Sequence, residues 1–251
     1  MVQRVCPLCH GTKDVKDFRK SHFIPASLYH SGKKGLQYGT RLGTGRLERE
    51  IKELLLFSSC ERLLDEGGES YVLSHIAPKV KGDSPLHRAL SLALPRESYP
   101  DISRFSGDDL GINLSRFAHF ALSIVWRATI HDWMMPDGTI LPRQAIGDFE
   151  PPIRNYLLGG SFPPDTAVIV IVCSDDESRR IWTTPTILIE ANCLNFRFLA
   201  RGVFFRVMMG YQLSDAFREM SCISARKCLF FGSAAHRMPE IMSILDPRHV
   251  E

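Results

Sequence analysis

The apolar residues of this chain recur in two periods, and each period predicts one kind of element. A helix is predicted over 115–135, where apolar side chains return at three- and four-residue steps and Asn113 or Ser115 is available as the N-cap. A strand is predicted over 167–173, an unbroken run rich in Val and Ile that is typical of a strand buried on both faces. A second strand is predicted over 186–191, and 195–211 predicts either a hairpin or a strand followed by a bulge.

Shorter elements are predicted in the rest of residues 81–251. Prolines and polar residues over 78–109 predict a connector around a helix at 86–94, and we expect further helices at 148–159, 214–221 and 238–245. This second region therefore predicts a mixed α+β domain of unknown role, suited to recognition of a substrate or a partner.

The first 80 residues predict a separate, smaller unit. We expect strands at 18–28 and 50–58, joined by a Gly-rich basic loop at 33–45. A helix is expected from Cys60 and is interrupted at Gly67-Gly68, with a second piece over 69–76. A strand-strand-helix unit of this size buries little core, so a bound metal ion would add substantially to its stability.

The composition indicates the general class of protein. The 251 residues are 44% hydrophobic and 24% charged, as in ordinary soluble globular proteins. We see no targeting signal and no apolar run of membrane-spanning length, so we expect a cytoplasmic protein that does not bind membranes.

The charge is uneven along the chain. The net charge is +3, but residues 1–50 alone hold ten Lys and Arg against four acids. A basic excess there is what a phosphate-binding face needs, and the alternative is a solvated basic surface. The candidate nucleic-acid contacts are Lys20, Lys33, Lys34 and Arg41.

Cysteine spacing indicates a metal site in the same segment. Cys6 and Cys9 are separated by two residues, as in zinc knuckles, and Cys60 follows a short apolar run where a second knuckle would return. Either His10 or a residue from elsewhere supplies the fourth ligand, or apolar packing has replaced the ion. Seven cysteines with one close pair favour reduced thiols over a disulfide framework.

The order of these motifs resembles one known family. A cysteine pair, the segment Ser21-His22-Phe23-Ile24-Pro25, an apolar strand and then Cys60-Glu61 are similar to the HNH (ββα-metal) endonucleases, over about the first third of the chain. The resemblance implies a zinc-stabilised ββα module with structural Zn²⁺ on the cysteines, and His22 as the general base. It also implies a catalytic Mg²⁺ or Mn²⁺ held by Glu69 or Glu61, DNA as substrate with RNA as the alternative, and a role in phage defence. Without the resemblance, both glutamates are ordinary acids near a helix start.

A second hypothesis is a catalytically inactive zinc module that binds nucleic acid or assembles with a protein partner. Three departures from the family pattern motivate it. Phe57 stands where a fourth thiolate would be, Ser21 stands where many members have a metal-binding Asp, and no Asn occurs between His22 and Cys60.

Overall fold

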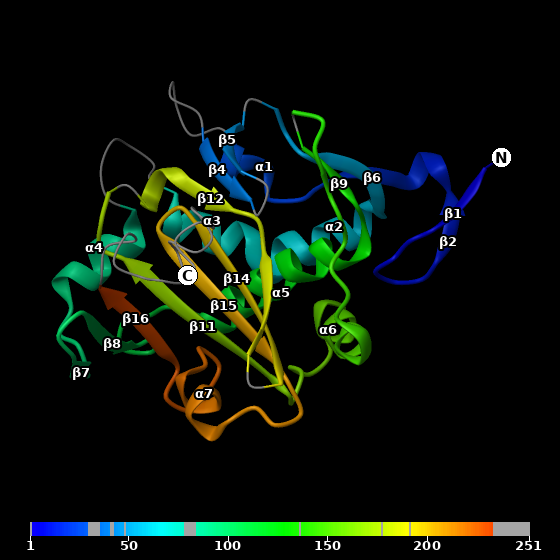
Figure 1. Cartoon of the computed structure of the whole chain (residues 1–251). Helices are drawn as coiled ribbons and strands as arrows, with labels where there is room; N and C mark the ends of the chain where they lie inside the picture. Colours follow the sequence, from blue (N-terminus) through cyan, green and yellow to red (C-terminus); the bar gives the residue numbers. More distant parts are fainter. Residues whose placement is uncertain are drawn as a thin grey trace.

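A mixed β-sheet organises the fold (Figure 1). The computed structural model describes residues 2–29, 36–40, 43–47, 49–77, 84–135, 137–176, 178–190 and 192–232. Within these ranges the sheet has ten strands. Nine follow one another in the order β5 (Gly43–Leu47), β4 (Leu36–Thr40), β12 (Ile181–Thr183), β14 (Cys193–Ala200), β15 (Val203–Met209), β11 (Thr166–Cys173), β16 (Cys228–Gly232), β8 (Ile102–Ser106) and β7 (Glu97–Ser98), and β13 (Thr186–Glu190) pairs with β14.

Helix α5 (Leu114–Ile130) covers one face of the sheet, against β11 and β15 (Figure 1). It begins where the Asn113 side chain accepts a hydrogen bond from the Ser115 amide, so the predicted cap is confirmed. Alternate residues of β11 divide between two cores: Val168 and Val170 face α5, whereas Ile169 packs under α7 (Asp215–Met220) on the opposite face. The strand is thus buried on both faces, as its sequence predicts.

The remaining elements are small. The other helices are α1 (Ala26–Tyr29), α2 (Ser58–Leu64), the π-helix η2 (Asp65–Glu69), α3 (Ser70–Ile76), α4 (Pro85–Leu92) and α6 (Glu150–Leu157), with 3-10 turns at η1 (Val15–Asp17), η3 (Gly147–Phe149) and η4 (Ser178–Arg180). Among the described residues, three antiparallel pairs lie outside the large sheet: β1 (Gln3–Val5) with β2 (Thr12–Asp14), β3 (Phe18–His22) with β6 (Lys52–Phe57), and β9 (Trp133–Met134) with β10 (Ile140–Leu141).

Several predictions about secondary structure are wrong. The helix expected over 115–135 ends at Ile130, and Trp133–Met134 form β9 instead. The expected basic loop at 33–45 contains β4 and β5, and β4 joins the large sheet by pairing with β12. The expected connector at 78–109 supplies β7 and β8 to the other end of the sheet, besides the predicted short helix. The helix expected at 238–245 lies outside the described residues.

The first 77 residues contain more strands than the two predicted, because β1, β2, β4 and β5 accompany β3 and β6. β3 pairs with β6, and α2 follows β6 directly. The first strand ends at His22 instead of continuing to 28. The α-helix is interrupted at Gly67-Gly68 as predicted, since the π-helix η2 separates α2 from α3. The coarse prediction of a mixed α+β fold is therefore confirmed, whereas the HNH assignment stays a prediction.

One hydrophobic core runs across the predicted boundary at 80. The Phe23 ring, just after β3, stacks on Trp133 with centroids 5.0 Å apart and meets the edge of Trp182 at 5.7 Å. Arg201, at the turn between β14 and β15, donates a hydrogen bond to the Leu28 carbonyl. The proposed domain division itself stays a prediction.

Within the described ranges, no helix is both long and apolar enough to cross a bilayer.

Candidate metal centre and adjoining cavity

Three cysteines from distant parts of the sequence meet at one point. The Sγ atoms of Cys6, Cys9 and Cys60 all lie within 4.8 Å of one another. Sulfurs bound about 2.3 Å from one tetrahedral ion lie about 3.8 Å apart, and the Cys6 and Cys60 sulfurs are 3.7 Å apart. The three thiols could therefore hold a metal ion, with a spacing that suits zinc.

A tight turn between β1 and β2 presents the first two thiols. The Cys6 amide donates to the Gly11 carbonyl at 2.9 Å, and the His10 amide donates to the Cys6 carbonyl at 2.9 Å. This turn requires a positive φ of 56° at His10. The His10 side chain is exposed and lies outside the thiol group, so it does not supply the fourth ligand in this arrangement. Among the described residues, no other Cys, His, Asp or Glu joins the three thiols.

The thiols differ in environment. Cys6 and Cys60 are buried, and Cys9 is exposed. Burial raises the pKa of the Cys60 thiol above its ordinary value, and the neighbouring thiols raise it further. Burial also opposes ionisation of Cys9, but hydrogen bonds from the Gly11 backbone and from the Cys60 and Cys6 thiols outweigh it and lower its pKa. Cys9 is thus the better candidate for the first thiolate to meet an incoming cation.

Phe57 occupies the position of the missing fourth thiol and packs instead. Its ring meets the edge of Phe18 at 4.6 Å and lies under the Lys13 ammonium, also at 4.6 Å. A side chain at Gly11 would press on this ring, so the turn and the end of β6 are in contact. Phe57 therefore packs among apolar side chains next to the turn that carries Cys6 and Cys9.

A cavity of about 630 Å³ lies beside the centre and contains the predicted catalytic residues. Successive residues of a helix point about 100° apart, so Cys60 can face the thiols while Glu61 faces the cavity. The lining comes from the end of β3, from α1, from α2 to α3 and from α5, and its ionisable members are His22, Glu61, Arg62, Asp65, Glu69 and Arg127. The structure thus brings His22, Glu61 and Glu69 together at one cavity.

Glu69 is already engaged in an ion pair. Its Oε1 lies 2.5 Å from Nη1 of Arg127, whose side chain is only 2% exposed. Burial raises the pKa of the Glu69 carboxyl, and the positive charge of Arg127 opposes that shift. Glu61 is more loosely held, with Oε2 3.9 Å from Arg127 and a side chain 25% exposed. Of the two predicted glutamates, Glu61 therefore has the more accessible carboxylate.

Three further residues of the cavity region were not among the predicted site residues. Asp65 follows Glu61 by four residues, a helical spacing that could have indicated it, and it accepts a hydrogen bond from the Ser70 hydroxyl at 2.5 Å. Arg127 looked like part of an apolar helix. Glu50 lies next to His22, with 3.3 Å between its Oε2 and the His22 Nε2, because the β3–β6 register places His22 opposite Lys52.

The remaining residues named in the sequence analysis are Ser21 and the predicted nucleic-acid contacts. The Ser21 hydroxyl is buried and accepts a hydrogen bond from the Leu56 amide at 3.2 Å, so it holds β3 to β6. Lys20 is exposed on β3. Lys33, Lys34 and Arg41 lie outside the described residues.

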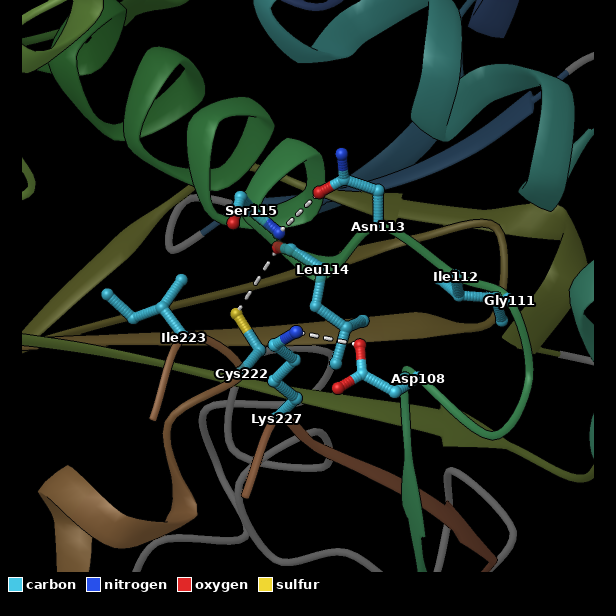
Figure 2. Close-up of a pocket in the computed structure, with 10 residues that line it drawn as sticks. Asp108, Gly111, Ile112, Asn113, Leu114, Ser115, Cys222, Ile223 and Lys227 are labelled. Carbon is cyan, nitrogen blue, oxygen red and sulfur yellow. Dashed lines mark hydrogen bonds and ion pairs between the residues drawn. The ribbon is translucent and has the colours of Figure 1, made fainter. Parts of the chain in front are cut away.

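A second pocket contains none of the predicted residues. It is about 390 Å³ and lies at the N-terminus of α5 (Figure 2). Its polar groups already have partners: Lys227 pairs with Asp108 at 2.7 Å, Asn113 caps the helix and the Cys222 thiol donates to the Leu114 carbonyl. We therefore assign no chemistry to it.

Comparisons with protein-family models, with curated proteins and with solved structures found no match for this chain. The chemistry of the cavity therefore has to follow from its own residues.

Proposed function

We propose that this protein is a metal-dependent endonuclease of the HNH type, which cleaves DNA phosphodiester bonds. The observation that carries the proposal is the convergence of His22, Glu61, Asp65 and Glu69 on one open cavity, beside three thiols that could hold zinc. A base and several carboxylates in one cleft are the groups that metal-assisted phosphodiester hydrolysis requires.

Each residue has a role in this proposal. His22, half-buried at the end of β3, would take a proton from the attacking water. Glu61 and Asp65 are the proposed ligands of a catalytic Mg²⁺ or Mn²⁺, because hard divalent cations prefer carboxylate oxygens and Glu69 is paired with Arg127. When bound, the metal would stabilise charge on the phosphate. Zinc on Cys6, Cys9 and Cys60 would fix α2 and the carboxylate at Glu61.

Arg127 would also act in the site. It lines the cavity while pairing with Glu69, so the pair carries no net charge. The other charged side chains that line the cavity are two acids, Glu61 and Asp65, and one base, Arg62, so the lining carries one excess negative charge. A net negative cavity favours binding of a cation before the phosphate arrives.

A catalytically inactive zinc module that binds nucleic acid is the second candidate. The Glu69–Arg127 pair favours it, since Glu69, one of the two carboxylates that the resemblance offers to the metal, is neutralised by a buried arginine. The Ser21 hydroxyl, bonded to the Leu56 amide, is likewise committed to the fold.

Plasmid cleavage with Mg²⁺ or Mn²⁺ separates the two candidates. For the nuclease, His22→Ala should lose cleavage by about 10²- to 10⁴-fold while still binding DNA. Glu61→Gln and Asp65→Asn should raise the metal concentration required. The matched control for His22→Ala is His131→Ala, which removes a partly exposed histidine beside Trp133. The control for the acid variants is Glu66→Ala, which removes an exposed acid next to Asp65 in η2. Binding without cleavage would support the inactive module, and cleavage unaffected in His22→Ala would exclude the proposed base.

Metal content tests the thiol centre separately. We expect about one zinc per chain, lost in Cys6→Ser and Cys60→Ser, whereas Cys193→Ala removes a thiol outside the group and should keep the metal. Full zinc retention in Cys60→Ser would rule out the three-thiol centre.

A further inference from the structure

His22 has a charged neighbour to which the resemblance gives no role. Its Nε2 lies 3.3 Å from Glu50 Oε2, and the Lys52 Nζ lies 2.6 Å from the same oxygen. Hydrogen bonds from Lys52 and then from His22 lower the pKa of Glu50 to about 2. Glu50 is therefore a carboxylate at neutral pH and can only accept from the imidazole.

The backbone around Glu50 is fixed from both sides. The Phe23 amide donates to the Ile51 carbonyl at 2.9 Å, which ties the residue after His22 to the residue after Glu50. The buried Tyr29 hydroxyl accepts from the Ile51 amide at 3.0 Å and lies 3.4 Å from its carbonyl oxygen. The approach of Glu50 to His22 thus follows from strand register and a buried anchor, and not from two mobile surface side chains.

We propose that Glu50 is a positioning residue for His22: its carboxylate accepts the Nε2–H and leaves Nδ1 as the nitrogen that takes the proton. This inference rests on the proposed function, in which His22 is the base. Within the described part of the chain, no hydrogen bond occupies Nδ1. A neutral imidazole has one donor and one acceptor nitrogen, so the partner of Nε2 decides which nitrogen can act as a base.

An ordinary surface ion pair would make a different prediction. Exposed pairs contribute little to stability and would leave turnover unchanged when removed. A positioning residue changes kcat, because it acts through the group that moves the proton, and leaves KM nearly constant.

The kinetic test compares Glu50→Ala, Glu50→Gln and Glu53→Ala. We expect Glu50→Ala to lower kcat for plasmid cleavage by about 10- to 100-fold, in the range found for lost outer partners of functional histidines. Glu50→Gln should recover most of that loss, since its amide oxygen can still accept from Nε2–H. Glu53→Ala removes an exposed carboxylate of β6, three residues after Glu50, whose side chain bonds to the Leu54 amide, and it should stay within about twofold of the parent. Equal rates for Glu50→Ala and Glu53→Ala would overturn the inference.

A measurement on the ring itself separates this inference from the nuclease proposal. Long-range ¹H–¹⁵N correlation spectra of the full chain, with His22 assigned through His22→Ala, report which ring nitrogen carries hydrogen. We expect a hydrogen-bonded Nε2–H signal in the parent and in Glu53→Ala, and its loss in Glu50→Ala. If the signal depends on Glu50 but the protein cuts no DNA, positioning stands and the nuclease proposal falls. If Glu50→Ala leaves the His22 signal unchanged, positioning is wrong whatever the activity.

Discussion

Arg127 is the buried residue that pairs with the acids of the cavity. Its side chain lies close to Glu69 and Glu61, and removing one partner of a buried ion pair leaves the other charge without compensation. We predict that Arg127→Met lowers the free energy of unfolding by about 3–5 kcal/mol, measured by urea denaturation at pH 7. The double variant Arg127→Met/Glu69→Gln should recover part of the loss, because neither charge then remains buried.

Arg154→Met is the matched control for this prediction. Arg154 pairs with Glu150 at 3.4 Å, one helical turn earlier in α6, and it is more exposed than Arg127. Its loss should cost about 1 kcal/mol or less. Equal costs for the two arginine variants would show that the Glu69–Arg127 pair has no special weight in the fold.

Candidate site residues could be predicted where their spacing in the sequence indicates a function, but not where their position depends on strand register. The two residues between Cys6 and Cys9 indicate a metal site, and the structure brings Cys60 to these cysteines. Glu50 has no such signal. It reaches His22 only because β6 pairs with β3 so that Lys52 stands opposite His22, and a shift of one residue would point it elsewhere.

The π-turn at Gly67-Gly68 lets two helices cross closely. A Cβ at Gly67 would collide with the His119 ring of α5, and a Cβ at Gly68 would lie 2.5 Å from the Arg116 carbonyl oxygen. We predict that both Gly67→Ala and Gly68→Ala destabilise the protein by about 1–3 kcal/mol, measured by thermal and urea unfolding. His119→Ala should rescue Gly67→Ala, because it removes the obstructing ring, but should not rescue Gly68→Ala, which meets backbone.

A double-mutant cycle decides this prediction. Additive effects of Gly67→Ala and His119→Ala would mean that the ring and the glycine do not limit the crossing. Both glycine variants should also reduce DNA cleavage if the proposed site is active, since Glu61, Asp65 and Glu69 all lie on the segment that the crossing holds in place.

His119 should also make stability depend on pH. Burial, with smaller contributions from the positive charges of Arg116 and Arg127, lowers its pKa from 6.5 to about 4. Below pH 6.5 the unfolded chain binds this proton and the folded protein does not, so the stability falls as the pH falls. We predict a loss of about 2 kcal/mol from this group between pH 7 and pH 5, measured by urea unfolding.

His119→Gln isolates that contribution, because glutamine does not titrate. The variant should show a smaller loss of stability between pH 7 and pH 5 than the parent. The depressed pKa of Glu50 acts in a separate window, below its ordinary value of 4.5, so it does not disturb this comparison. Parallel pH profiles for the two proteins would contradict the prediction.

Elements with a strong internal pattern were predicted, and elements that depend on a distant partner were not. Helix α5 and the strands β11, β14 and β15 carry their own periodicity. β4 lies in a Gly-rich basic stretch and is a strand because β12, about 140 residues later, pairs with it in parallel. β8 was hidden in a proline-containing connector and pairs with β16 near the other end of the described chain.

The Cys6 and Cys60 side chains and the large sheet share one hydrophobic core. The proposed boundary at 80 would allow the N-terminal unit to unfold by itself. The core instead includes residues from Cys6 to Leu229, and Phe23 is in contact with Trp133 and Trp182. The position of His22, one residue before Phe23, therefore depends on the second half of the chain as well as on its own strand pair.

We therefore predict one cooperative unfolding transition. Tryptophan fluorescence, far-ultraviolet circular dichroism and zinc release should share one urea midpoint, because contacts cross the boundary throughout the core. Phe23→Ala should move all three midpoints together, with a cost of about 3–5 kcal/mol, whereas Tyr99→Ala, at an exposed ring, should leave them unchanged. Zinc release at a lower urea concentration than the loss of circular dichroism would show that residues 1–80 unfold independently. In that case the cavity around His22 would be supported by the metal alone, and chelation would abolish its geometry while leaving the sheet intact.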